Sequence, residues 1–86
     1  MIDDIPKRKA IRSMEIEQEL MLHDAASKKV YVLNPTASMI WSLCDGFHTI
    51  EQIATELKKS YKEPKEDILQ DVCRTLEELK KHGLLE

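Results

Sequence analysis

Residues 33–46 read LNPTASMIWSLCDG, and this stretch decides how the rest of the chain is arranged. The side chain of Asn34 can accept a hydrogen bond from a free backbone N–H at a helix start, and Pro35 has no N–H to lose there. The stretch ends in Asp-Gly, and glycine commonly follows the last residue of a helix. We therefore predict a short helix with one apolar stripe. The stripe consists of Ala37, Ile40, Trp41 and Cys44, with Leu43 beside it.

Three runs of alternating apolar and polar residues precede this helix, as in strands that are buried on one face. Residues 17–19 join the first two runs and contain no Gly, Asn or Pro, whereas residues 24–28 open with an Asp that can cap a turn. The last run leads into the helix without a linker. The pattern predicts a three-stranded antiparallel meander. Its apolar positions are Met14 and Ile16 in the first strand and Leu20 and Leu22 in the second, and its third strand is residues 29–33.

Two more helices are predicted downstream. Thr49 and Gln52 have the spacing of a capping box and open an apolar stripe of about three turns. Pro64 can occupy the first position of a longer helix, which Gly83 ends, and the two leucines after this glycine are expected to pack back on the domain. The apolar face of the longer helix consists of Ile68, Leu69, Val72, Cys73, Leu76 and Leu79.

Three strands followed by three helices describe an α+β domain of the winged helix-turn-helix type. A chain of 86 residues, 42% of them hydrophobic, has enough apolar surface for one small core. We expect a single domain over residues 10–86. Residues 1–9 are charged, contain a proline and have no apolar period, which indicates a flexible N-terminal tail.

Charge and cysteine content favour some classes of function over others. The formal net charge is −3, and the last helix mixes acidic and basic residues, which disfavours a winged-helix DNA-binding regulator. The sequence has no apolar run of membrane-spanning length and no signal-peptide pattern at its start, so we expect a cytoplasmic protein that binds neither nucleic acid nor membrane. Cys44 and Cys73 form no CxxC pair and are expected to be free thiols.

No group of residues has the pattern of a catalytic or metal site. Cys44, Asp45 and His48 contain suitable atoms, but Gly46 interrupts their helical spacing and no second ligand pair accompanies them. The carboxylates are spread over helix surfaces and do not converge. We therefore expect no enzymatic activity, no catalytic residue, no metal and no cofactor. Trp41 is interpreted as a core residue, and His23 and His82 as solvated.

The third predicted strand, residues 29–33, is the best candidate for a binding site. If it lies at the edge of the sheet, its unpaired N–H and C=O groups can pair with a further strand. That strand can come from an extended peptide or from another protomer. A structural adaptor without peptide affinity is a third interpretation, which titration with peptides would separate from the first.

Three segments of the sequence resemble one known family. LNPTASMIWSLCDG, TIEQIATEL and DILQDVCRTLEELKKHGLLE are similar, in order and spacing, to coenzyme PQQ synthesis protein D (PqqD) and to the PqqD-like domains called RiPP recognition elements. The resemblance covers residues 31–85. Its most specific positions are Leu33-Asn34, Thr36, Ile40, Cys44-Asp45-Gly46, Asp71-Val72 and Gly83-Leu84.

The resemblance implies a winged-helix protein that is not itself a catalyst. Members bind the leader region of a ribosomally made precursor peptide as an added strand and present it to a modifying enzyme. In the PQQ pathway that enzyme is a radical SAM protein, and in lasso-peptide systems it is a leader protease or cyclase. The loop HDAASKK and Thr75 depart from the PqqD pattern, so the wider group is expected in preference to the PQQ pathway.

The resemblance and helix geometry together place the peptide between the third strand and the third helix. The opposite flank of that helix, Leu69 and Cys73, is the alternative. Apolar peptide side chains would meet the apolar stripe, and a basic one would meet the acidic rim. The predicted peptide-binding residues are Lys29, Val30, Tyr31, Val32, Leu33, Ile68, Asp71, Val72, Thr75, Glu78 and Leu79.

Overall fold

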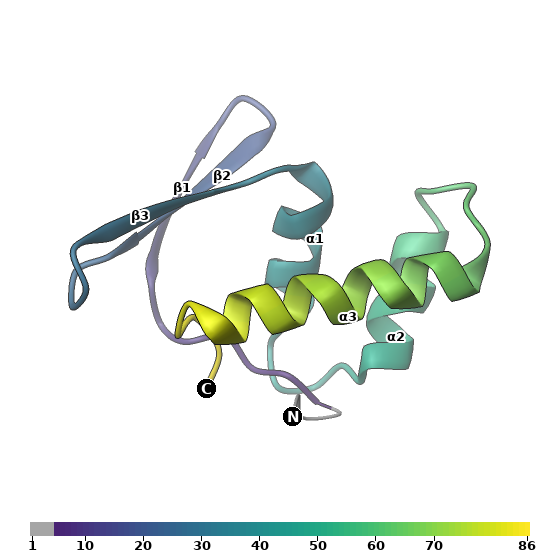
Figure 1. The fold of residues 1–86 in the computed structure, drawn as a ribbon. Coiled ribbons are helices and arrows are strands. Elements are labelled where there is room, and N and C mark those ends of the chain that lie inside the picture. Colours follow the sequence, from purple (N-terminus) through teal and green to yellow (C-terminus); the bar gives the residue numbers. More distant parts are fainter. Residues whose placement is uncertain (1–4) are drawn as a thin grey trace.

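The structure is a computed structural model that describes residues 5–86. An antiparallel sheet comes first in the chain and the helices follow, which confirms the predicted α+β class (Figure 1). The longest helix crosses the molecule from the sheet to the second helix. The elements are β1 (Arg12–Ile16), β2 (Glu19–Asp24), β3 (Lys29–Leu33), α1 (Pro35–Leu43), α2 (Ile50–Lys58) and α3 (Lys65–Lys81).

The sheet has the order β1-β2-β3, so β3 is an edge strand, as predicted. In the register of β2 and β3, Leu20 lies opposite Leu33 and Leu22 opposite Tyr31. Both leucines of β2 and Leu33 are buried. Because side chains alternate between the two faces of a strand, Tyr31 points to the same inner face as these leucines.

The expectation that Met14 and Ile16 lie on the buried face of the sheet is wrong. Met14 pairs with Met21, which belongs to the opposite face of β2 from Leu20 and Leu22. Met14 is 60% exposed and Ile16 47% exposed, because both point away from the helices. The alternation in β1 is therefore real, but its apolar face is the outer one.

The end of the segment expected to be a flexible tail, residues 1–9, is hydrogen-bonded to the domain. The backbone N–H of Arg8 donates to the carbonyl of Cys44 (2.8 Å), and the N–H of Lys9 donates to the carbonyl of Leu84 (2.9 Å). These bonds link the end of α1 to the C-terminus. The first four residues of the expected tail lie outside the described part of the chain.

The predicted helix starts are confirmed for α1 and α2. The N–H of Ala37 donates to the side chain of Asn34 (2.8 Å). Thr49 and Gln52 form a reciprocal capping box, with N–H to side-chain distances of 2.8 and 3.1 Å. Pro64 precedes the first turn of α3 and does not belong to it, because its extended backbone makes it the N-cap residue.

One apolar core lies between the inner face of the sheet and the three helices. Trp41 is 4% exposed within it, which confirms its interpretation as a core residue. The two leucines after Gly83 are also buried, so the C-terminus is held by packing. The buried residues are Leu20, Leu22, Leu33, Ile40, Trp41, Cys44, Ile53, Ala54, Leu57, Ile68, Val72, Leu76, Leu79, Leu84 and Leu85.

Candidate functional site

A hollow of about 430 Å³ lies between the edge strand β3 and the C-terminal half of α3. Its floor is apolar, since Leu33, Leu79 and Leu84 are buried there. Thr75 and Glu78 of α3, and His82 directly after it, contribute polar atoms to the lining. The lining residues are Val30, Tyr31, Val32 and Leu33 of β3, Ala37 of α1, Thr75, Glu78 and Leu79 of α3, and His82 and Leu84 after α3.

The end of α3 is held close to the edge strand at this hollow. The ring centroids of Tyr31 and His82 lie 5.0 Å apart, with the ring planes tilted by 46°. The Nε2 atom of His82 lies 3.6 Å from a carboxylate oxygen of Glu78. The hollow thus has an aromatic wall, an apolar floor and one carboxylate on its rim.

The open side of the hollow is the sheet edge itself. Among the described residues β3 has a neighbouring strand on one side only, so alternate N–H and C=O groups of its backbone point away from β2. A strand bound there would pair with these groups. Every second side chain of that strand would then face the hollow.

The structure brings most of the predicted site residues together. Thr75, Glu78 and Leu79 share the hollow with residues 30–33 of β3. The opposite flank of α3, which was the alternative, does not line it. Lys29 belongs to β3 at the far end of the strand and is exposed.

Three predicted residues lie elsewhere. Val72 has no exposed surface and points into the core. Ile68 and Asp71 line a smaller depression near the start of α3, together with Tyr61 and other residues of α1, α2 and the α2–α3 loop. They were selected because the apolar stripe of α3 is continuous, whereas only its C-terminal part reaches the edge strand.

Three residues of the hollow were missed by sequence reasoning. Ala37 and Leu84 were assigned to packing alone, and His82 was taken to be solvated. The available signal was the position of His82 directly before Gly83, which ends α3. A side chain at the end of this helix can contact the edge strand, as His82 contacts Tyr31. His82 is partly exposed, and its ring lies against Tyr31.

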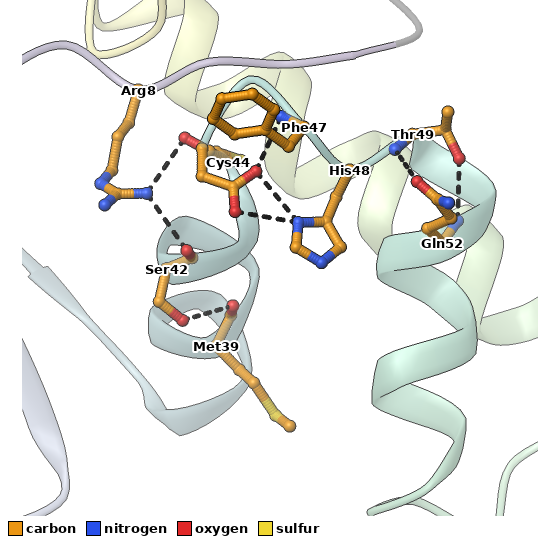
Figure 2. Close-up of polar contacts among 9 residues, drawn as sticks. Arg8, Met39, Ser42, Cys44, Phe47, His48, Thr49 and Gln52 are labelled. Atoms are coloured by element: carbon orange, nitrogen blue, oxygen red, sulfur yellow. Dashed lines mark hydrogen bonds and ion pairs between the residues drawn. The ribbon is translucent and has the colours of Figure 1, made fainter.

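Polar contacts around the α1–α2 turn form a separate cluster (Figure 2). The guanidinium of Arg8 donates to the carbonyls of Ser42 and Cys44, each at 3.1 Å. Both oxygens of Asp45 lie 3.0 Å from Nδ1 of His48. The hydrogen bond from His48 is the main cause that lowers the pKa of Asp45 below its usual range.

This cluster braces the turn and does not resemble a reactive site. Burial raises the pKa of the Cys44 thiol to about 12, so the thiol stays protonated at neutral pH. Over residues 5–86 no three His, Cys, Asp or Glu side chains are placed to hold a metal ion. No described helix is long and apolar enough to cross a membrane.

Comparison with known proteins gives one family and two structural neighbours. The family model described as coenzyme PQQ synthesis protein D (PqqD) matches residues 19–85. No curated protein sequence matches the chain. A solved structure described as TbiB1 in complex with the TbiA(beta) leader peptide has a TM-score of 0.84 and 26% sequence identity, covering 93% of this chain and 94% of that one.

The second neighbour is described as lasso peptide synthetase B1 complexed with the leader peptide. Its TM-score is 0.85 at 22% identity, and the match covers 95% of this chain and 98% of that one. At this identity the likeness shows the fold, which is the winged-helix arrangement predicted from the sequence. Both neighbours match this chain over nearly their whole length, so the three strands and three helices correspond as a unit.

Proposed function

The chain belongs to the family of coenzyme PQQ synthesis protein D, and from this premise we propose that it is a leader-peptide-binding accessory protein. It binds the leader region of a ribosomally made precursor peptide as an added strand on β3. It then presents the precursor to a separate modifying enzyme. The observation that carries the proposal is the combination of a free sheet edge with an adjoining apolar hollow.

The chemistry of the site fits an extended peptide. The exposed edge of β3 supplies backbone hydrogen bonds, which give affinity without selecting a sequence. The hollow beside β3 gives specificity for the peptide sequence, because Tyr31, Leu33 and Leu79 can bury an apolar peptide side chain. Glu78 lies at the rim of the hollow, where its carboxylate favours a basic residue of the bound peptide.

The protein's own residues favour binding without catalysis. Its buried thiol is protonated, and the carboxylate and imidazole of Asp45 and His48 are paired with each other in a turn away from the hollow. The chemistry on the precursor is therefore assigned to the partner enzyme. Two structural neighbours in complex with leader peptides support this role, and one of them is named as a lasso peptide synthetase component.

The partner enzyme has two candidates. The family description points to the PQQ pathway, in which the modifying enzyme is expected to be a radical SAM protein. One neighbour is described as lasso peptide synthetase B1, which favours a lasso-peptide system, in which the family resemblance implies a leader protease or cyclase. The protein's peptide site serves either enzyme, because leader capture precedes the reaction and does not depend on its chemistry.

Peptide capture is tested by NMR with ¹⁵N-labelled protein. The probes are the TbiA(beta) leader peptide of the neighbour and peptides selected on this protein from a displayed random library. We expect saturable shifts of the amides of residues 29–33 and 75–82, with the mass of the peptide unchanged after incubation. Failure of the library to enrich any binder, or shifts confined to other residues, would overturn the proposal.

A further inference from the structure

The outer face of the sheet carries an apolar row that no described residue covers. The pairing of the strands aligns Met14, Met21 and Val32 side by side across β1, β2 and β3. Met14 is 60% and Val32 57% exposed. Ile16 and Val30 extend the row on either side, and both are also about half exposed. We call these five side chains the outer row.

Charged residues of opposite sign lie at the two ends of the same face. Arg12 lies opposite His23 in the register of β1 and β2, and Val30 completes this line on β3. Beyond the middle of the sheet, Ile16 lies opposite Glu19. The outer face is therefore basic at one end, apolar in the middle and acidic at the other end.

We propose that two copies of this chain associate through their outer rows, related by a two-fold axis that runs across the strands. Such an axis lays Met14, Met21 and Val32 on the same residues of the partner. It also reverses the strand direction, so that the end with Arg12 and His23 in one copy lies over the end with Glu19 in the other. Sheets packed face to face with nearly aligned strands are a common arrangement.

The charge pattern selects this axis and a second copy as the occupant. A two-fold axis parallel to the strands would place the basic ends on each other, at an electrostatic cost. The axis across the strands instead makes one face complementary to itself. The contact area of five side chains is below that of a standard interface, so we expect a dissociation constant of roughly 10 μM to 1 mM.

This association leaves the backbone edge of β3 open, but it shares Val30 and Val32 with the lining of the proposed peptide site. The hollow beside α3 lies on the inner face of the sheet, and the free backbone groups of β3 point sideways in the plane of the sheet. Face-to-face dimers thus differ from edge-to-edge pairing of two β3 strands, which would occupy the peptide site.

Sedimentation velocity of the full chain tests the proposal over a concentration series. The unmodified protein is expected to shift from monomer to dimer as its concentration rises. Met14→Glu should raise the dissociation constant at least ~10-fold, because a carboxylate would be buried in the apolar middle. Circular dichroism checks the fold of the variant, in which an exposed side chain is replaced. A chain that stays monomeric throughout, or a dimer that survives this substitution, overturns the proposal.

A charge exchange tests the axis. Arg12→Glu should weaken the dimer, since both ends of the face become acidic, and Arg12→Glu combined with Glu19→Arg should restore it. Lys62→Glu is the matched control, because it makes the same change in net charge at an exposed position in the α2–α3 loop. Equal weakening by Lys62→Glu, or no recovery in the double variant, would contradict the axis.

Discussion

The ring of Tyr31 on the edge strand lies against the ring of His82 at the end of α3, with 5.0 Å between the ring centroids. The contact joins two segments that are far apart in the sequence and sets the width of the hollow between them. His82 also approaches the carboxylate of Glu78. One imidazole thus links the aromatic wall of the hollow to its acidic rim.

Replacement of His82 should weaken peptide binding more than it lowers the stability of the folded protein. His82→Ala is expected to lower the affinity for a selected leader peptide about 3- to 10-fold, with a loss of unfolding free energy below about 1 kcal/mol. Calorimetric titration and urea unfolding measure the two effects. His23→Ala, on the outer face, is the matched control. Equal effects of the two substitutions on affinity would contradict a role for His82.

The helix ends could be predicted because each is encoded by side chains that are close in sequence. Asn34, Thr49 and Gln52 form the caps that their spacing indicates, and Gly46 and Gly83 both adopt positive φ angles after helices. Such local signals require no knowledge of the tertiary packing. The three helices followed from these signals, although Pro64 is the N-cap of α3 and not its first residue.

Features that depend on long-range pairing were not predictable in the same way. Alternation in β1 shows that Met14 and Ile16 share a face, but only the register with β2 shows that this face is the outer one. The segment before β1 is held through backbone hydrogen bonds of Arg8 and Lys9, which leave no side-chain pattern. Likewise, the stripe of α3 does not reveal that Val72 belongs to the core and Thr75 to the hollow.

The capping box of α2 should contribute measurably to stability. Thr49→Ala removes the acceptor for the N–H of Gln52 and is expected to cost about 1 kcal/mol of unfolding free energy. Thr55→Ala, within the same helix, is the control, because its hydroxyl bonds to the carbonyl of Glu51 inside the helix and caps nothing. Urea unfolding compares the two. A loss no larger for Thr49→Ala than for Thr55→Ala would show that the cap contributes little.

The two thiols should differ in reactivity. With a pKa of about 12, roughly one Cys44 side chain in 10,000 is a thiolate at pH 8, and the residue is buried. Cys73 is only partly buried. A disulfide reagent should therefore modify one thiol in the folded protein and two in guanidinium chloride. Cys73→Ser should abolish the reaction of the folded form, and rapid modification of that variant would contradict the burial of Cys44.

The Asp45–His48 pair predicts a contribution to acid stability. Hydrogen bonds hold the pKa of Asp45 in the folded protein below its ordinary value of 3.8, so the folded state favours the carboxylate. The contribution is fully present above that value and is lost as the pH falls through the lower folded pKa. Asp45→Asn should reduce stability at pH 7 and flatten its decline between about pH 5 and pH 2. Unfolding curves with the same pH profile for both proteins would contradict this account.

The rim of the hollow gives the sharpest test of the peptide site. Glu78 lines the hollow beside β3, whereas Asp71 lies two turns earlier on α3 and lines the separate depression. Both carry one negative charge on the same helix, so Glu78→Lys and Asp71→Lys change the net charge equally. Only the first variant changes the charge next to the bound strand.

We expect Glu78→Lys to weaken a selected leader peptide that carries a basic residue by at least ~10-fold, or about 1.4 kcal/mol, and Asp71→Lys to change its affinity less than ~2-fold. Thr75→Trp should weaken all leader peptides, because the indole fills space that an apolar peptide side chain needs. Calorimetric titration gives the affinities, and circular dichroism confirms that each variant folds. Equal losses for the two lysine variants would indicate attraction by overall charge, and unchanged affinity in both Glu78→Lys and Thr75→Trp would place the peptide outside this hollow.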